Sequence, residues 1–359
     1  MPKNDLRARV DGVGDNAPPV RRRRRGSGAI TLADVARMAG VSPITASRAL
    51  NAPETVAAET LARVRDAVAR SGYVPNLLAG GLASARSRLV AAVVPTITGP
   101  VFLRTIEALT EQLEAAGYQL MVGQSGYTHS REDALLDAII GRRPDAIVLT
   151  GVMHSTVGRN RLIASSIPVV ETWDLTPTPI DMLVGFSHEA TGEAVARHLA
   201  ATKRERFAVL TADDARGMRR LRAFSDTIAR LRGVNPTDAS AVHLVSAPGT
   251  LASGRDGLRQ LLQTDPRIDA IFCSSDLIAL GVLLEAQARG IQVPAQLAVV
   301  GFGDLDFAAD AHPALTTVRI DGGAIGRQAA RFIVSRVNGE EIPARIVDVG
   351  FELVVRDSG

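Results

Sequence analysis

The sequence has little cysteine and little aromatic content: one cysteine, Cys273, one tryptophan, and 4% aromatic residues in 359. A single cysteine cannot form an intramolecular disulfide, so we expect a reducing, cytoplasmic compartment. No apolar run approaches the roughly 20 residues that span a bilayer. The first residues mix charge with Gly and Pro, which argues against a secretory signal. Composition therefore excludes a disulfide scaffold and predicts no membrane partner.

The motifs of common catalytic sites are also missing. The six histidines show no paired metal-ligand spacing, and neither a GxSxG elbow nor a GxxxxGK[ST] loop occurs. Gly301-Phe302-Gly303 has two glycines of a dinucleotide fingerprint, but Asp306 stands at the third position. We read this stretch as a turn, and the sequence predicts no enzyme, no metal and no cofactor.

Length and charge predict more than one domain. The chain is long enough for two or three domains, and 46% of its residues are hydrophobic. Residues 1–88 carry a net charge of +8, whereas the whole chain carries +3, which leaves −5 on the remainder. A basic head on an acidic body is typical of a nucleic-acid reader with a separate sensing domain. Residues 1–28, which include five consecutive arginines, predict a disordered basic arm that either attracts phosphates or is only a solvated tail.

Residues 31–51, TLADVARMAGVSPITASRALN, predict two short helices joined by a tight turn. Apolar and small residues recur at helical spacing, and Gly40 stands where the turn requires a missing Cβ. Ser42 followed by Pro43 is typical of a helix start. The second helix presents small hydrogen-bond donors and one arginine, which suits a DNA groove. A plain helical hairpin would share the hydrophobic pattern.

A third helix and an unusual linker follow. Residues 57–71 carry an apolar face of Leu61, Val64 and Val68, and Gly72 ends the helix, so a three-helix head is predicted. Residues 76–85, NLLAGGLASA, have leucines at helical spacing around two destabilising glycines. Such a segment favours a hinge helix that orders only against a partner and DNA; the alternative is a flexible linker.

From residue 89 the pattern changes to apolar strands that alternate with amphipathic helices. The predicted strands are 89–95, 118–124, 146–151, 168–172, 182–187, 207–211, 241–246, 270–276, 297–302 and 316–321. The predicted helices are 102–116, 132–142, one through residue 198, 218–231, one to residue 289, and 324–338. Continuous apolar strands between helices predict parallel sheets covered on both faces. Ten strands exceed one ordinary sheet, so we expect an α/β fold with two lobes and a ligand cleft between them.

Together these motifs resemble the lactose-repressor (LacI/GalR) family of transcription regulators over residues 30–359. The matching stretches are TLADVARMAGVSPITASRALN, TLARVRDAVARSGYVPNLLAGGLAS, LVGFSHEATGEAVARHL, AIFCSSDLIALG and LAVVGFGDLDF…HPALTTVRID. The resemblance implies a helix-turn-helix head at 29–75, a hinge helix at 76–88, and a periplasmic-binding-protein-like body at 89–359. The body alone resembles stand-alone sugar-binding modules, an alternative that the head argues against.

The resemblance also implies the DNA contacts. A homodimer, or a tetramer, would place paired heads on a pseudo-palindromic operator at the nucleoid, with the hinge leucine wedged into a base step. The residues carried over for DNA binding are Thr31, Ser42, Pro43, Ile44, Thr45, Ser47, Arg48, Tyr73, Asn76 and Leu82. Relatives often have a polar pair where this chain has Pro43-Ile44. We therefore expect apolar readout there, for instance of a thymine methyl, unless Ile44 packs on the third helix.

For the effector, Arg220 matches the family's ligand-gripping arginine. Where relatives usually have an acidic residue that binds sugar hydroxyls, this chain has Gly303, followed by Asp304. Gly249 replaces an aromatic residue of the relatives, and Ser275 stands where asparagine is common. A pocket that has lost an acid and kept a cation favours an anionic ligand. Stretches such as IPVVETWD resemble the gluconate-repressor branch and predict a sugar acid such as gluconate, with or without a phosphate group. The effector residues expected are Thr98, Phe102, Trp173, Asp174, Arg220, Ser275 and Asp304, although Thr98, Phe102, Trp173 and Asp174 could equally serve the core or loops.

The resemblance implies a ligand-gated repressor of a sugar or sugar-acid utilisation operon. The dimer would hold the hinge segments close enough to form helices on DNA, and the effector would shift that equilibrium by binding two states differently. The sequence leaves open whether the effector releases the operator or promotes its binding.

Overall fold

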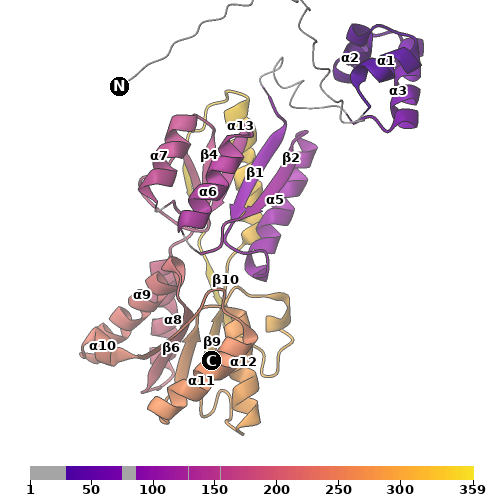
Figure 1. Ribbon diagram of the computed structural model, residues 1–359. Helices are drawn as coiled ribbons and strands as arrows, with labels where there is room; N and C mark the ends of the chain where they lie inside the picture. The colour runs from indigo at the N-terminus through magenta and orange to yellow at the C-terminus, as the bar shows by residue number, and fades with distance from the viewer. Residues whose placement is uncertain (1–29, 75–85, 128, 154) are drawn as a thin grey trace, which may run out of the picture. The chain divides into compact units, whose positions relative to one another are not determined.

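The computed structural model describes residues 30–74, 86–127, 129–153 and 155–359 (Figure 1). The chain forms two compact units, Met1–Ala83 and Ser84–Gly359, here called the head and the body. The basic arm predicted for residues 1–28, and Asn76 and Leu82 of the predicted hinge, lie outside the described residues. Within the described part, no helix is both long and apolar enough to cross a membrane.

The head is a three-helix unit whose ends are capped by its own sequence. Its elements are α1 (Leu32–Ala39), α2 (Pro43–Asn51), the 3-10 turn η1 (Pro53–Thr55) and α3 (Ala58–Ser71). Thr31 caps α1, Gly40 follows it at φ 64°, and Ser42 caps α2 with Pro43 in the first position. Gly72 ends α3, also at φ 64°. The predicted helices, turn and caps of the head are confirmed.

Small residues let the three helices of the head approach closely. Val35, Ala39, Ala49, Val64 and Ala67 are all at most 5% exposed and form one cluster. Both α2 and α3 pack on α1. Alanines at these contacts bring the helix axes close, and each helix keeps its other face free for solvent or a partner.

The first lobe of the body is a parallel sheet with helices on its faces (Figure 1). Its strands run in the order β11-β5-β4-β3-β1-β2, and every pair is parallel. Its elements are β1 (Leu89–Val94), η2 (Pro100–Phe102), α5 (Leu103–Ala115), β2 (Gln119–Gln124), α6 (His129–Ile140), β3 (Ala146–Thr150), α7 (Thr156–Ser165), β4 (Val169–Thr172), β5 (Met182–Gly185), α13 (Gly322–Val337) and β11 (Ile346–Asp348).

The second lobe repeats this plan, with strand order β12-β10-β9-β8-β6-β7. Its elements are α8 (His188–Ala201), β6 (Phe207–Ala212), α9 (Ala215–Arg232), α10 (Pro236–Ala239), β7 (Ala241–Val245), α11 (Leu251–Thr264), β8 (Ala270–Cys273), α12 (Asp276–Ala288), β9 (Ala298–Phe302), η3 (Asp306–Ala308), β10 (Thr316–Arg319) and β12 (Glu352–Val354). The predicted two-lobed α/β body is confirmed.

Several elements are missing from the predicted set. The strands β11 and β12 are three residues long and partly exposed, so they lack an apolar run, and β12 pairs antiparallel with β10. The second sheet is therefore not purely parallel, contrary to the prediction. The prediction also lacks α7 and α11, and α11 contains glycines that argue against a helix. Gly254 is needed there because a Cβ would lie 2.2 Å from the Ile278 carbonyl oxygen of α12.

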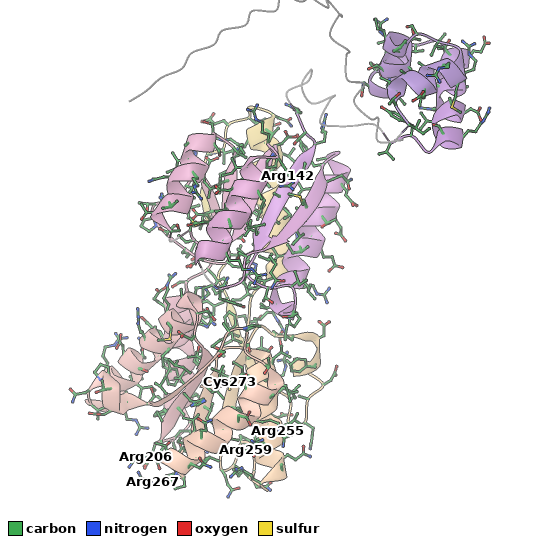
Figure 2. All side chains as sticks on the ribbon, viewed as in Figure 1. Arg142, Arg206, Arg255, Arg259, Arg267 and Cys273 are labelled. Atoms are coloured by element: carbon green, nitrogen blue, oxygen red, sulfur yellow. The ribbon has the colours of Figure 1, made fainter. Side chains whose placement is uncertain are left out.

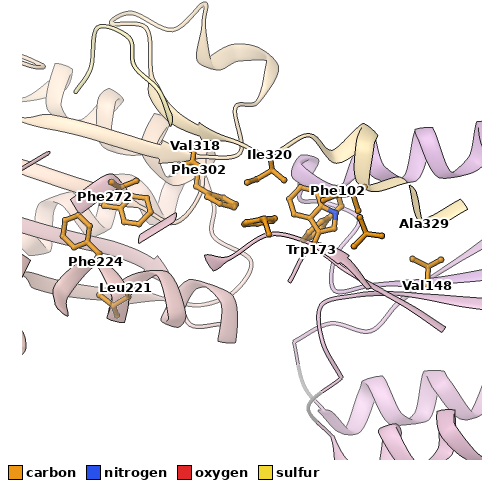
Figure 3. Close-up of a cluster of buried hydrophobic side chains, with 14 of the residues drawn as sticks. Phe102, Val148, Trp173, Leu221, Phe224, Phe272, Phe302, Val318, Ile320 and Ala329 are labelled. Carbon is orange, nitrogen blue, oxygen red and sulfur yellow. The ribbon is translucent and has the colours of Figure 1, made fainter. Parts of the chain in front are cut away.

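The chain passes between the lobes three times, after β5, after β10 and after β11. Apolar side chains line these passages and join both lobes into one hydrophobic cluster. Figure 3 shows Phe102, Trp173, Phe302 and Ile320 gathered between the lobes, with Phe224 and Phe272 deeper in the second lobe and Val148 in the first. This apolar continuity forms the walls of the cleft between the lobes.

Candidate effector site and nucleic-acid interface

The exposed face of α2 is the nucleic-acid candidate in the head. Pro43, Ile44, Ser47, Arg48 and Asn51 border a shallow groove on this face. Ile44 is 72% exposed, so it does not pack on α3. Burying this exposed side chain against a base methyl would remove apolar surface from water, which is favourable. This is the apolar readout expected for Pro43-Ile44.

Several predicted DNA contacts already hold the head together. The Thr31 hydroxyl donates to Asp34 Oδ2 at 2.6 Å, and this bond is the main cause that lowers the pKa of Asp34 to about 2. Ser42 Oγ accepts from the Thr45 backbone N–H at 3.1 Å. Asn51 donates to Ser47 Oγ at 3.3 Å. Ser47 accepts in its bond, so its O–H can donate to a phosphate, whereas the O–H of Thr31 already donates to Asp34.

The side chains of Arg48 and Tyr73 differ in exposure and in their contacts within the head. Arg48 is exposed, and no ion pair or hydrogen bond of its side chain is found among the described residues. Tyr73 is half-buried against the apolar cluster of the head. Arg48 is therefore available for a guanine or a phosphate, whereas Tyr73 reaches a partner from a fixed position.

A cavity of about 100 Å³ lies between the two lobes of the body. Its walls come from loops that follow the carboxyl ends of strands, where open α/β sheets bind ligands. The loop after β1 and the start of α9 after β6 lie at the corresponding switch points of the two sheets. The lining residues are Thr96, Gly99, Pro100, Val101, Phe102, Tyr127, Trp173, His188, Ala212, Asp214, Arg216, Arg220, Pro248, Gly249, Ser274, Ser275, Leu277, Phe302 and Leu305.

Arg220 is the buried cation of this cavity. Its side chain lies on α9 and is only 5% exposed. Nη1 contacts His188 Nδ1 at 3.0 Å, Nη2 donates to the Ser274 carbonyl oxygen at 3.1 Å, and the guanidinium lies 4.0 Å from the Phe302 ring centroid. Burial lowers the pKa of Arg220 to about 10, so the group stays charged at neutral pH.

His188 orients Arg220 and is itself neutral. An arginine can only donate, so Nδ1 of His188 must accept, and Nε2 then donates to the Trp173 carbonyl oxygen at 3.0 Å. Burial, reinforced by Arg220, Arg216 and Arg219, holds the pKa of His188 well below 6.5. The imidazole thus links the first lobe to Arg220 in the second without adding charge.

An aromatic wall completes the cavity. The Trp173 ring meets Phe102 and Phe186 edge to face, at 5.1 and 5.9 Å between centroids. Trp173 Nε1 donates to Thr105 Oγ1 at 3.0 Å, which fixes the indole. Trp173 is the one tryptophan of the chain, so its fluorescence reports on this cavity directly.

Four of the seven predicted effector residues line the cavity: Phe102, Trp173, Arg220 and Ser275. The other three lie outside its lining, and each is bonded to a neighbour. The hydroxyls of Thr98 and Thr96 are 2.8 Å apart. Asp174 Oδ1 accepts from Arg219 at 2.5 Å. Asp304 pairs with Arg319 at 2.6 Å and with Arg356 at 2.7 Å.

Sequence reasoning missed several lining residues, chiefly His188, Asp214, Arg216 and Ser274. Asp214 and Arg216 follow the apolar strand β6 directly. The first polar residues after a parallel strand lie at the carboxyl edge of its sheet, so their position was a usable signal. His188 stands at the start of α8, just after the passage from β5, and gave no signal of its own.

The charges of the cavity differ from those on the surface of the second lobe. Figure 2 labels Arg206, Arg255, Arg259 and Arg267 at the lower end of that lobe, and Cys273 in its interior. Arg255 and Arg259 bond Glu285, and Arg267 bonds Asp265.

In the cavity, Arg216 Nη1 and Arg220 Nε are buried without a hydrogen-bond partner among the described residues. The described residues form no cluster suited to a metal ion.

A DNA-binding head joined to a two-lobed body with a charged cleft defines a ligand-responsive DNA-binding regulator. Comparison with known proteins agrees. "Bacterial regulatory proteins, lacI family" matches residues 31–76, and "Periplasmic binding protein-like domain" matches residues 196–359. The chain is 38% identical over 335 residues to the HTH-type transcriptional regulator GntR of Pseudomonas aeruginosa, which covers 93% of this chain and 97% of that protein. The chain belongs to the lacI family of transcriptional regulators.

Two further comparisons place the chain within this family. It is 28% identical to the HTH-type transcriptional regulator IdnR of Escherichia coli K12, over 90% of this chain and 97% of the relative. A crystal structure of a LacI-family regulator from Silicibacter pomeroyi matches with a TM-score of 0.85 and 31% identity, over 92% of this chain and 99% of that one. The relatives named are transcriptional regulators, and regulators of this family bind operator DNA and small-molecule effectors and are generally dimeric.

Proposed function

We propose that this protein is a repressor whose effector is a sugar acid such as gluconate, bound in the cavity between the lobes. The observation that carries the proposal is the pair of buried arginine N–H groups, on Arg216 and Arg220, that have no acceptor among the described residues. A carboxylate offers two acceptor oxygens and a negative charge to such donors. The relatives named GntR, and the resemblance to the gluconate-repressor branch, support the same ligand class.

The rest of the lining suits a polyhydroxylated ligand. The hydroxyls of Ser274, Ser275, Thr96 and Tyr127 can exchange hydrogen bonds with ligand hydroxyls. The aromatic wall can cover the C–H faces of a sugar chain. Asp214 is the sole acid in the described lining, and its carboxylate already caps α9 through two backbone N–H groups at 3.0 Å. A neutral sugar would leave both arginines without an anionic partner.

Isothermal titration tests the ligand. The full-length protein should release or absorb heat with gluconate and give none with glucose or sorbitol at the same concentration. Heat with a neutral sugar and none with gluconate would reject the sugar acid.

We further propose that a homodimer presents two heads to a pseudo-palindromic operator of a sugar-acid utilisation operon. Pro43, Ile44 and Arg48 would read bases. The residues that would contact the DNA backbone are Thr31, Ser42, Thr45, Ser47, Tyr73 and Asn76. Selection of genomic fragments bound by the protein should return inverted repeats, and gluconate should change their retention in a gel. The wedge role of Leu82 stays a prediction; Leu82→Ala should weaken operator binding while the head stays folded.

The alternative of a stand-alone sugar-binding module is not favoured. Such a protein needs no helix-turn-helix head, and the regulator from Pseudomonas aeruginosa aligns with 93% of this chain, so its match spans the head as well as the body. A module of that kind would retard no DNA fragment in the same gel.

A further inference from the structure

We propose that Arg216, which sequence reasoning did not single out, is the residue that makes this cavity select a singly charged carboxylate. It would act as a second guanidinium beside Arg220 and reach the ligand from across the cleft. This inference rests on the proposed function and names the charge of its effector.

Arg216 belongs to the second lobe but its guanidinium lies against the first. The residue is in the first turn of α9, directly after the capping Asp214. Its guanidinium carbon lies 5.2 Å from the ring centroid of Phe102, a residue of the first lobe. A Cβ on Gly151, which follows β3 of the first lobe, would lie 3.9 Å from Arg216 Nη1. The side chain therefore spans the cleft and stacks on its far wall.

The hydrogen-bonding capacity of Arg216 is unmet in this position. Nη1 is buried without a partner among the described residues, and the same holds for Nε of Arg220. The nearby Asp214 carboxylate is 3.9 Å from Arg216 Nε, too far for a hydrogen bond. A buried donor without an acceptor is costly. An acceptor brought by the ligand removes that cost on both arginines at once.

The charge of the lining sets the charge of the ligand. Arg216 and Arg220 contribute two positive charges and Asp214 one negative charge, while His188 is held neutral. Just outside the lining, Arg219 is bonded by both Asp174 and Glu189, so this group adds no positive charge. The net charge of the lining residues, +1, is balanced by one carboxylate. A phosphorylated sugar acid would bring excess negative charge into a poorly solvated site, where it costs more than in water.

The size of the cavity adds a role in closure. A cavity of about 100 Å³ is smaller than the cavity of about 150 Å³ that accommodates benzene. A six-carbon acid in this cavity would therefore contact both lobes at once. Because Arg216 is anchored in one lobe and stacked on the other, its contact with a bound carboxylate also ties the lobes together around the ligand.

Titrations followed by Trp173 fluorescence test the inference. The proteins are the full-length wild type, Arg216→Gln, Arg216→Lys, and Arg222→Gln as a matched control, since Arg222 is exposed on the same helix and lies outside this cavity. The ligands are gluconate, sorbitol as its uncharged counterpart, and 6-phosphogluconate. A thermal melt of each variant verifies that it is folded.

We expect Arg216→Gln to weaken gluconate binding at least tenfold, Arg216→Lys to weaken it less, and Arg222→Gln to change it less than twofold. Sorbitol binding should be weak and equal in all four proteins. Wild type should prefer gluconate to 6-phosphogluconate at least tenfold. Unchanged gluconate affinity in Arg216→Gln, or tighter binding of 6-phosphogluconate, would overturn this inference and leave the proposed function standing. Wild type that binds sorbitol and no acid would overturn both.

Discussion

The head and the effector cleft are built from contacts of opposite range. In the head, Thr31 bonds Asp34 and Ser42 bonds Thr45, so each cap is made within three residues of sequence. In the cleft, Arg220 bonds Ser274, 54 residues away, and Trp173 bonds Thr105, 68 residues away. The head is thus specified by local rules, whereas the cleft exists only after two sheets have formed. Perturbations should therefore act very differently in the two regions.

Glycines show this difference and give the largest expected effect. In the head, a Cβ added to Gly40 or Gly72 would meet no atom within 4 Å; these glycines are needed for their left-handed backbone. In the body, Gly281 lets α12 approach α11, since a Cβ there would lie 2.2 Å from the Leu251 carbonyl oxygen. We expect Gly281→Ala to lower the free energy of unfolding of the body by about 3 kcal/mol. Denaturant unfolding followed by Trp173 fluorescence measures it.

The control for that experiment is Gly290→Ala, just past the end of the same helix. Gly290 has φ 70° and open space around it, so its replacement should cost about 1 kcal/mol. Equal losses for the two variants would show that close helix approach is not what requires Gly281.

The cleft should respond to the loss of its buried cation without any change in the head. Arg220→Met removes the guanidinium that contacts His188 and Ser274. Charge-assisted hydrogen bonds are worth roughly 1.5–3 kcal/mol each, so we expect gluconate affinity to fall about 100-fold. Operator affinity without effector should change little, and gluconate at a concentration that just saturates wild type should affect it little. Gel retardation with and without gluconate would contradict this if the variant still responded like wild type.

The same contrast explains what could be predicted from sequence. The three helices, caps and turn of the head followed from local patterns, since Gly40, Ser42 and Pro43 act within one turn. The ten core strands followed from their apolar runs. The strands β11 and β12 and the helix α11 could not be predicted in this way. They are stabilised by contacts with elements distant in sequence: strand pairing with β5 and β10, and packing on α12.

The cleft was predictable only in part. Arg220 was found by resemblance, and Phe102, Trp173 and Ser275 fell on the loops that line the cavity. Asp174 and Asp304 carry charges that suggest a ligand, but arginines distant in sequence bond them. Conversely, the position of Arg216 after β6 places it at the edge of the sheet, but its contact with Phe102 of the other lobe could not be read from the sequence.

On the head, surface apolarity should matter for DNA and not for stability. Ile44 is 72% exposed on α2. We expect Ile44→Ala to change the stability of the head by less than about 0.5 kcal/mol, and to weaken operator binding about tenfold through a lost methyl contact. Met38→Ala, at a 47% exposed position of α1, is the matched control and should alter neither. Fluorescence anisotropy with labelled operator measures the affinity, and an unchanged value for Ile44→Ala would remove it from the readout.

The smallest effect expected is the change with pH in the free energy of unfolding of the body. It comes from buried groups that titrate near neutral pH, of which the described part of the small head has none. The pKa of His188 is held below 6.5 in the folded protein, mainly by burial and then by Arg220. Above about pH 6.5 the imidazole is neutral in both states, so its contribution is constant. Below that value the unfolded chain takes up a proton that the folded body refuses, and stability is lost as the pH falls.

Asp276 works in the opposite direction. Burial, the main cause, raises its pKa to about 6 from 3.8, so the folded body binds a proton between those values while the unfolded chain does not, and stability is gained as the pH falls. Comparing wild type with His188→Gln cancels that shared contribution. We expect the body to lose about 1 kcal/mol more in wild type than in His188→Gln between pH 7 and 5.5. Parallel stability curves for the two proteins would mean that the imidazole is protonated in the folded cleft, and hence that Arg220 is oriented by some other group.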